Sequence, residues 1–364
     1  MESYTILRDG REAYPLMIKA INSARHSILF ANFCMIQGRV FNRFQTALID
    51  AAERGVSVHI LLDAHGSKDT NPEQIADLKK AGVQVVWFRP LNKLKPFNYN
   101  RRLHKKLLVV DDAIGFTGGV GVGDFWINNE HYPKPWRDTH FGFRGQIVEN
   151  MVDAFAQSWH EMSSRALPME GKPEHLTEAI TDITATNSPT FGYNNLAVVG
   201  ELIIAHINAA EKTLNLTTAY FGPSKVLLDA ILAAAKRGVH IRLLVNGPHT
   251  NHQSAAEAGR VHFPDLVEAG IEVYEYQPTK MHAKILTYDG VVSCVGSANL
   301  NYRSFYHDEE FNLTVRDSDF IKKLDRQFEN DLKSSKRVTK RELRRLPRKT
   351  IWRRKLYSFG RYFY

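Results

Sequence analysis

The sequence predicts an α/β protein made of two similar domains, each a mixed β-sheet flanked by helices, with pseudo-twofold symmetry and an active site between them. Three observations support this prediction. The order of helix-like and strand-like segments in the first half of the 364-residue chain is repeated in the second half. The segment AAERGV at 51–56 recurs as AAKRGV at 234–239, and an H-x-K-x4-D pattern occurs once in each half. Repetition at this scale indicates a duplicated domain.

The first half alternates between helical and extended patterns. Apolar residues at helical spacing predict helices and short β-branched runs predict strands. The helices are expected at 12–24, 44–54 and 75–81, and the strands at 27–33, 56–62 and 83–88. Gly55 and Gly82 follow the second and third helices, where glycine commonly ends a helix. Helices that end in glycine and lead into short strands predict an α/β sheet with covering helices.

The second half repeats this order. Its helices are expected at 202–210, 226–237 and 263–269, and its strands at 213–219, 239–245 and 271–276. Gly238 and Gly270 stand where Gly55 and Gly82 stand in the first half. The offset between the copies varies from 178 to 188 residues, which fits a duplicated domain with small insertions in its loops.

The composition is that of a globular protein. Hydrophobic residues make up 43% and charged residues 24% of the chain, which excludes a wholly disordered protein. Cys34 and Cys294 lie in or beside expected strands, so we expect buried, reduced thiols and a reducing compartment. No run approaches the ~20 apolar residues of a membrane-spanning helix. The N-terminal residues also lack the basic start and apolar core of a signal peptide.

The net charge of +9 is concentrated near the C-terminus. Residues 333–364 contain thirteen Lys or Arg and one acidic residue, so their net charge is +12 and that of the rest is −3. Four apolar residues of this segment share one helical face: Trp352, Leu356, Phe359 and Phe363. A basic amphipathic helix of this kind is typical of a segment that lies on an anionic membrane. The alternatives are a helix that packs on its own domain and a basic tail that binds nucleic acid.

These observations divide the chain into four parts. We assign residues 1–168 to an N-terminal domain and residues 191–332 to a C-terminal domain, each with one copy of the H-x-K-x4-D motif. The polar segment 169–190 is interpreted as a linker, although 179–184 also fits a first strand of the second domain. Residues 333–364 form the basic tail.

The repeated motif gathers chemically active side chains. It consists of His104, Lys106 and Asp111 in the first half and of His282, Lys284 and Asp289 in the second. A histidine and a lysine two positions apart on a strand point to the same face. An apolar run follows each motif, and then Gly118-Gly119-Val120-Gly121 in the first half and Gly296-Ser297-Ala298-Asn299 in the second. The first half therefore has no counterpart of the Asn299 amide.

This duplicated pattern resembles the phospholipase D superfamily, and the matching halves cover nearly the whole chain. The resemblance implies phosphodiester chemistry in which one neutral histidine attacks phosphorus to give a phosphohistidine, while the other, protonated, donates to the leaving oxygen. It also implies that neither a metal nor another cofactor takes part. Lys106, Lys284 and Asn299 would hold the non-bridging oxygens. Which histidine attacks stays open, and family precedent favours His104.

Further candidate site residues follow from the same resemblance. Asp138 and Glu310 match the carboxylates that orient the imidazoles, although Asp138 also fits a simple salt bridge with Arg137. Asp111 and Asp289 belong to the candidate catalytic set as motif residues, but their positions predict that they close turns. The candidate substrate-binding residues are Asn299, Ser297, Gly119 and Arg102. We expect Lys105 to be a solvated neighbour.

Four segments are similar to bacterial cardiolipin synthases of the type without membrane-spanning helices: 100–104 (NRRLH), 136–140 (WRDTH), 220–223 (YFGP) and 299–304 (NLNYRS). The similarity implies transfer of a phosphatidyl group to the free hydroxyl of phosphatidylglycerol, giving cardiolipin and glycerol. It implies a monomer or weak oligomer bound peripherally to anionic phospholipid at the cytoplasmic face of a bacterial cell membrane.

Two other functions remain compatible with the sequence. One is a phospholipase D-type phosphodiesterase that hydrolyses phospholipid or nucleic acid. The other, a lipid-binding scaffold without activity, is disfavoured by two intact motifs. The sequence leaves the acceptor open among water, glycerol, phosphatidylglycerol and phosphatidylethanolamine.

Overall fold

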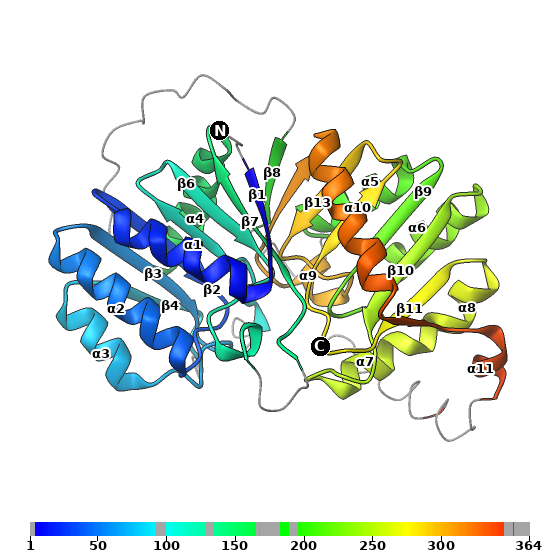
Figure 1. Cartoon of the computed structure of the whole chain (residues 1–364), viewed down its shortest axis with the longest axis horizontal. Coiled ribbons are helices and arrows are strands. Elements are labelled where there is room, and N and C mark those ends of the chain that lie inside the picture. Colours follow the sequence, from blue (N-terminus) through cyan, green and yellow to red (C-terminus); the bar gives the residue numbers. More distant parts are fainter. Residues whose placement is uncertain are drawn as a thin grey trace.

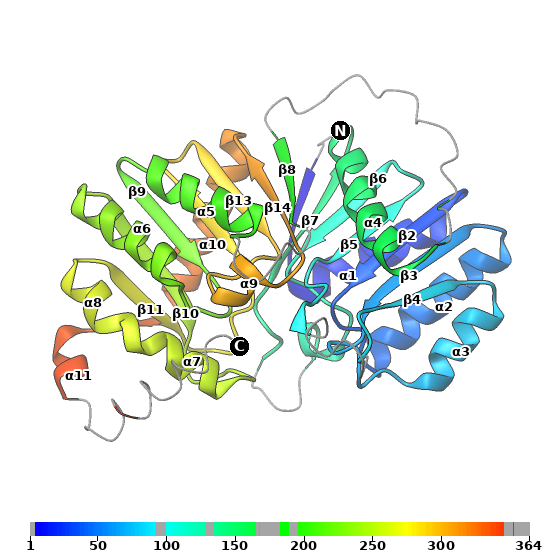
Figure 2. The ribbon, with the colours of Figure 1, turned by 180° about the vertical axis from the view of Figure 1, so that it is seen from behind.

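The protein folds into two α/β domains that lie side by side (Figures 1 and 2). The computed structural model describes residues 4–91, 100–128, 134–164, 167, 183–188, 196–345 and 352. Each domain contains one mixed sheet with helices on both faces. The fold class predicted from the repeated pattern is therefore confirmed.

The N-terminal sheet has seven strands in the order β1-β7-β6-β5-β2-β3-β4. The strands are β1 (Tyr4–Arg8), β2 (Ser27–Asn32), β3 (Ser57–Asp63), β4 (Gln84–Phe88), β5 (Leu107–Val110), β6 (Ile114–Gly118) and β7 (Thr139–Arg144). The helices are α1 (Asp9–Ser23), α2 (Arg39–Glu53), α3 (Pro72–Lys80) and α4 (Ile147–Met162). Strands β2, β3 and β4 run parallel, and the other pairs are antiparallel. Apolar side chains of α1, α2 and α3 cover one face, and α4 covers the other.

The C-terminal sheet repeats this topology, with the order β15-β11-β10-β9-β12-β13-β14-β8. The strands are β8 (Ile183–Ser188), β9 (Thr213–Thr217), β10 (His240–Asn246), β11 (Glu272–Tyr276), β12 (Ile285–Tyr288), β13 (Val292–Gly296), β14 (Glu310–Val315) and β15 (Ser335–Arg337). The helices are α5 (Val198–Ala209), α6 (Lys225–Lys236), α7 (Gln253–Gly259), α8 (Phe263–Glu268), α9 (Tyr302–Tyr306), α10 (Ser318–Leu332) and α11 (Lys340–Arg344). Strands β8 to β14 correspond one to one to β1 to β7, and β15 is an addition at the edge.

Some elements were not expected from the sequence patterns, and β8 was expected only as the alternative first strand at 179–184. Helices α4 and α10 cover the second face of each sheet and had not been expected. Strand β8 pairs with β14 over its whole length, so it belongs to the C-terminal sheet although it lies inside the segment 169–190 assigned to the linker. The remaining residues of that segment are outside the described part of the chain.

A shared apolar core joins the two domains. It combines side chains from β5, β7 and α4 of the first domain with side chains from β13, β14 and α10 of the second. Phe320 on α10 stands at its centre, with its ring centroid 4.9 Å from that of Tyr4 and 5.7 Å from that of Phe141. An apolar interface of this kind resists relative motion of the domains. It therefore fixes the geometry of the site that lies beside it.

The first part of the basic tail packs on the C-terminal domain. β15 pairs antiparallel with β11, and a capping box formed by Thr339 and Glu342 begins α11. Trp352 is 74% exposed, and Leu356, Phe359 and Phe363 lie outside the described residues. The membrane-binding face of the tail thus stays a prediction. Among the described residues, no helix has the length and apolar character needed to span a bilayer.

Both cysteines are buried and unpaired, as expected from the sequence. Burial raises the pKa of the Cys294 thiol to about 11. Because the thiolate is the reactive form, this thiol is a poor nucleophile at neutral pH.

Candidate active site

The two motif histidines stand at the domain boundary, and backbone hydrogen bonds tie each one to the opposite domain. His104 stands three residues before β5, and its backbone N–H donates to the Glu309 carbonyl at 2.9 Å. His282 holds the same place before β12, and its N–H donates to the Arg137 carbonyl at 2.7 Å. The repeat therefore brings the two motifs together through matching contacts across the interface.

Each histidine is oriented by a carboxylate from the other domain. Nδ1 of His104 lies 2.9 Å from Oε1 of Glu310, which begins β14. Nδ1 of His282 lies 2.7 Å from Oδ2 of Asp138, which precedes β7. A carboxylate on one ring nitrogen fixes the tautomer and leaves Nε2 as the atom that can meet a substrate. The site thus contains two histidine–carboxylate pairs, and both cross the domain interface.

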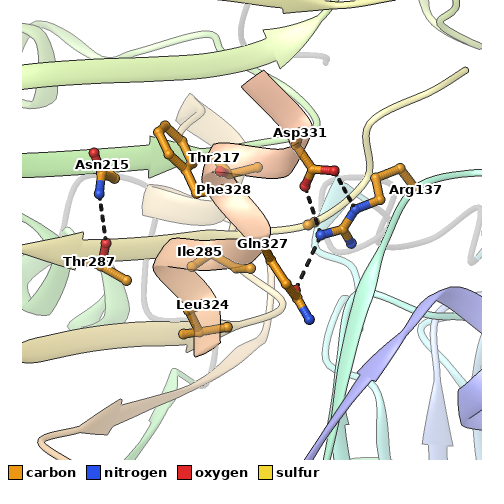
Figure 3. Close-up of a pocket in the computed structure, with 10 residues that line it drawn as sticks. Arg137, Asn215, Thr217, Ile285, Thr287, Leu324, Gln327, Phe328 and Asp331 are labelled. Carbon is orange, nitrogen blue, oxygen red and sulfur yellow. Dashed lines mark hydrogen bonds and ion pairs between the residues drawn. The ribbon is translucent and has the colours of Figure 1, made fainter. Parts of the chain in front are cut away.

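Arg137 does not use its neighbour Asp138 as an ion-pair partner. Figure 3 shows its guanidinium directed toward α10, where Nε and Nη2 lie 2.9 and 2.7 Å from the two carboxylate oxygens of Asp331. Nη2 also donates to Gln327. This bidentate pair is buried, with 3% of Arg137 exposed, and it anchors the segment that carries Asp138 to the C-terminal domain. The Asp138 carboxylate therefore pairs with His282 and not with Arg137.

The two carboxylates are stabilised by different donors. Glu310 accepts hydrogen bonds from Ser297 at 2.5 Å and Ser304 at 2.6 Å. Asp138 accepts one from the indole N–H of Trp126 at 2.8 Å and one from the Thr139 backbone N–H at 2.8 Å. Trp126 therefore takes, in the first half, the part that hydroxyl groups take in the second.

This difference explains why the first motif has glycine where the second has serine and asparagine. A Cβ atom at Gly119, the counterpart of Ser297, would lie 2.1 Å from Oδ1 of Asp138. A Cβ atom at Gly121, the counterpart of Asn299, would lie 2.5 Å from the Cys34 sulfur. Neither position has room for a side chain, so the departure from the motif follows from packing against Asp138 at Gly119 and against Cys34 at Gly121.

The electrostatics of the pairs favour ionised carboxylates and neutral imidazoles. Burial would raise the pKa of Glu310, but His104, Lys106 and the Ser297 hydroxyl hold it below its usual value. Burial lowers the pKa of His104, and burial together with Lys284 lowers that of His282. A negative charge in the cavity acts in the opposite direction on both imidazoles.

The motif lysines lie beside the histidines and are buried. The Lys106 ammonium donates to the His104 carbonyl, and the Lys284 ammonium to the His282 carbonyl. Burial lowers the pKa of Lys284 to about 7, although Asp138 acts to raise it. Lys284 therefore changes charge near neutral pH.

The motif aspartates stand at the far end of the motif strands from the histidines. Asp111 accepts hydrogen bonds from the backbone N–H groups of Arg25, His26 and Ser27. Asp289 accepts the equivalent three from Glu211, Lys212 and Thr213. Each aspartate thus fixes the loop before the neighbouring antiparallel strand, β2 for Asp111 and β9 for Asp289. Both aspartates stand at turns, as expected, and contact backbone groups rather than the histidines.

A cavity of about 710 Å³ brings the reactive groups together. The candidate residues that line it are Arg102, His104, Lys106, His282 and Asn299. Asp138, Glu310, Ser297, Lys284 and Gly119 are buried and do not line it. Aromatic rings of Phe33, Phe125 and Trp136 form part of the wall. Two imidazoles, two carboxylates behind them and cationic groups at one cavity suit attack on an anionic phosphodiester.

Sequence reasoning misjudged Lys105 and missed Lys280. Lys105 was expected to be solvated but is fully buried, with its ammonium 3.2 Å from Glu309 across the interface. Lys280 is equally buried and lines the cavity. The strand pattern places Lys105 on the face opposite to His104 and Lys106, which was the available signal. For Lys280 the same alternation was the available signal, because it stands two positions before His282, but its contacts come from distant segments.

Comparison with known proteins identifies the family to which this chain belongs. A family described as "Cardiolipin synthase, PLD-like domain" matches residues 17–124 and 203–332. The chain belongs to this PLD-like family. The PLD-like chain is 33% identical over 348 residues to the probable cardiolipin synthase YwiE of Bacillus subtilis (strain 168), covering 92% of the chain and 67% of that relative. It is 31% identical over 341 residues to a cardiolipin synthase of Geobacillus sp. (strain WCH70), covering 91% and 66%.

The PLD-like chain thus spans about two thirds of the length of the curated relatives that it matches. Among solved structures, the phosphatidylserine synthase of Haemophilus influenzae Rd KW20 superposes with a TM-score of 0.76. That match covers 100% of this chain and 96% of the other at 14% identity. At this identity the likeness shows the fold alone.

Proposed function

We propose that this PLD-like protein is a phosphatidyltransferase that makes cardiolipin from phosphatidylglycerol in two steps, through a phosphohistidine. The observation that carries the proposal is the pair of histidines at one cavity, each held by a carboxylate of the opposite domain. One group that attacks and one that transfers protons are what such a double displacement needs. The relatives named cardiolipin synthase supply the substrate class.

In the first step, Nε2 of His104 attacks the phosphorus of one phosphatidylglycerol molecule. The bond from phosphorus to the glycerol oxygen breaks, and His282 gives that oxygen a proton, so that glycerol leaves. The negative phosphodiester raises the pKa of the imidazoles in the cavity, which allows His282 to hold the proton. Lys106 and Asn299 in the cavity wall, with the Lys284 ammonium beside His282, stabilise the charge that builds up on the non-bridging oxygens.

In the second step, the terminal hydroxyl of another phosphatidylglycerol attacks the same phosphorus. His282, now neutral, takes the proton of that hydroxyl, and the bond between phosphorus and His104 breaks. Cardiolipin is released and both histidines return to their starting states. No step requires a metal or another cofactor.

The site and domain assignments form part of this proposal. Asp138 and Glu310 orient the imidazoles, Arg102 contributes positive charge at the cavity, and Ser297 and Gly119 shape the surroundings of the two carboxylates. Residues 1–168 and 191–332 act as the two half-site domains, with β8 of the segment 169–190 added to the second, and the basic segment 333–364 follows them. That segment would hold the protein on anionic lipid at the cytoplasmic face as a peripheral enzyme.

The test is incubation with phosphatidylglycerol vesicles in EDTA, followed by analysis of the lipid and water-soluble products. We expect cardiolipin and an equal amount of glycerol. H104A and H282A should each abolish both products, because the histidines act as a unit. H26A removes an exposed histidine outside the cavity and serves as the matched control.

Three outcomes would contradict the proposal. Phosphatidic acid as the main lipid product would identify a hydrolase. Nicking of plasmid DNA without lipid turnover would identify a nuclease. Activity lost in EDTA and restored by a divalent cation would show that catalysis needs a metal ion, which the proposed mechanism does not include.

A further inference from the structure

Lys280 is a buried cation in the wall of the active-site cavity. Its side chain has no exposed surface, and its ammonium lies 3.9 Å from the ring centroid of Trp136 and 4.9 Å from that of Tyr220. The ammonium donates to the Tyr220 hydroxyl at 2.7 Å and to the Asn251 amide oxygen at 2.5 Å. The Tyr220 hydroxyl in turn donates to Asn251. An ammonium has three N–H groups, and these two neutral acceptors use two of them.

Lys280 differs from the arginines of the same cavity in having no carboxylate beside it. Arg102 lies 3.5 Å from Asp63, and Arg303 lies 2.6 Å from Asp308. Within the described residues, no carboxylate oxygen comes within 4.0 Å of the Lys280 ammonium. A buried charge is normally paired, because leaving water without a counter-charge is unfavourable. The missing partner is therefore an anion that the cavity receives.

The position of Lys280 relative to the histidines decides which anion this is. The two rings that contact its ammonium also contact His282, with centroid distances of 5.5 Å for Trp136 and 6.3 Å for Tyr220. The ammonium that contacts His282 directly is that of Lys284, 3.1 Å from Nδ1, whereas Lys280 is linked to His282 through the two shared rings. The phosphorus under attack must lie between the two imidazoles, beside Lys106 and Lys284, so Lys280 serves a second negative group farther along the cavity.

We propose that Lys280 binds the phosphate of the acceptor lipid, so that the site selects an alcohol carrying its own phosphate one glycerol away from the reacting hydroxyl. This inference rests on the proposed phosphatidyl transfer. With the donor on His104, the acceptor hydroxyl meets His282 as the base. The acceptor's glycerol then extends past the rings of Trp136 and Tyr220, so that its phosphate meets the Lys280 ammonium. Water and simple alcohols can also be deprotonated by His282, but they have no phosphate that Lys280 could bind.

Burial and the nearby Lys284 lower the pKa of Lys280 well below its usual value, although the charge of Asp138, which is paired with His282, acts to raise it. A phosphate beside the ammonium opposes both effects, so binding of the acceptor restores the charge. The rings of Trp136 and Tyr220 hold the amino group in place and stabilise its charge once the acceptor is bound.

The first experiment is a competition between two acceptors in one reaction. Phosphatidylglycerol vesicles are incubated with the protein and a fixed concentration of ethanol, and the ratio of cardiolipin to phosphatidylethanol is measured. Both products form from the same phosphatidyl-enzyme, so the ratio does not depend on how much enzyme is folded. K280M should lower the ratio by at least about tenfold, because a hydrogen bond to a charged group is lost.

Two further variants test whether the effect depends on a positive charge at position 280. K280R keeps the charge and should keep a larger part of the ratio than K280M. K68M removes the same charge from an exposed lysine at the same cavity and should leave the ratio unchanged. An unchanged ratio in K280M, or an equal fall of both products, would overturn the inference while leaving the transferase proposal intact. If the unaltered protein makes neither product, the proposed function itself fails.

A second measurement needs no variant and therefore covers the case in which K280M does not fold. The unaltered protein is offered glycerol or glycerol 3-phosphate as a soluble acceptor. Both present the same primary hydroxyl, and only the second has a phosphate at the right separation. We expect transfer to glycerol 3-phosphate to have the higher kcat/KM by about tenfold. Equal or poorer use of glycerol 3-phosphate would overturn the inference.

Discussion

Gly119 gives a test in which the motif and the structure predict opposite results. By alignment of the two motifs, G119S makes the first half more like the second, where Ser297 donates to Glu310. In the structure, a Cβ atom at position 119 would lie 2.1 Å from Oδ1 and 2.7 Å from Cγ of Asp138. Real Cβ contacts are essentially never shorter than 3.0 Å. The substitution must therefore displace the Asp138 carboxylate.

The size of the effect follows from that displacement. To reach an ordinary contact distance, the carboxylate has to retreat by about 1 Å, and a misplacement of that size can reduce a rate by about 100-fold. The 2.7 Å hydrogen bond to His282 would then be broken. Complete loss of the orienting carboxylate in a comparable histidine pair reduces kcat by about 10⁴-fold. We expect G119S to lower kcat by between about 100-fold and 10⁴-fold.

The assay is the initial rate of cardiolipin formation at saturating phosphatidylglycerol, with the melting temperature measured in parallel. G123A is the matched control, because its backbone is extended at φ 177° and the nearest atom to its new Cβ is 3.6 Å away. G123A should keep both its kcat and its melting temperature. A kcat for G119S close to that of the unaltered protein would refute the placement of the Asp138 carboxylate.

Three other predictions concern charge, stability and membrane binding. Because the Lys284 ammonium has a pKa of about 7, kcat/KM should fall as the pH rises through about 7, and K284R should move that fall to higher pH in a pH–rate profile. K105M leaves buried Glu309 without its counter-charge and should lower the urea-derived free energy of unfolding by about 3–5 kcal/mol, whereas K105M/E309Q should lose less; a loss in K105M below about 1 kcal/mol would contradict the buried pair. Removal of residues 346–364 should weaken sedimentation with anionic vesicles without lowering the melting temperature, since β15 and α11 remain; equal sedimentation of both proteins would show that this segment is not the anchor.

The repeated α/β framework could be predicted because each of its helices and strands leaves a pattern in its own short stretch of sequence. Helical and alternating apolar patterns, with Gly55 and Gly82 at helix ends, identified the elements that cover one face of each sheet. Helices α4 and α10 were missed although α10 has a clear N-cap in Asp317. Their apolar faces complete a core that both domains share, and the identity of the partner is not visible along one stretch of chain.

The catalytic side chains could be predicted from the sequence, but which carboxylate contacts which histidine could not. The motif identified both histidines, and the downstream acids supplied the carboxylates. That Glu310 would serve His104 and Asp138 would serve His282 depends on how the two domains face each other. The same holds for Lys280, whose neighbours Trp136, Tyr220 and Asn251 come from three separate segments. Tertiary contacts of this kind leave no periodic signal in the sequence.

The central claim is that the two histidines share one phosphate, with His104 as the nucleophile and His282 as the proton donor. The most direct test uses H282A and a phosphatidyl ester of p-nitrophenol, whose leaving group needs no proton from the enzyme. We expect a burst of nitrophenol equal to the amount of H282A protein, with the phosphatidyl group found by mass spectrometry on the peptide that contains His104. H104A should give no burst. A label on any other residue, or an equal burst from H104A, would contradict the claim.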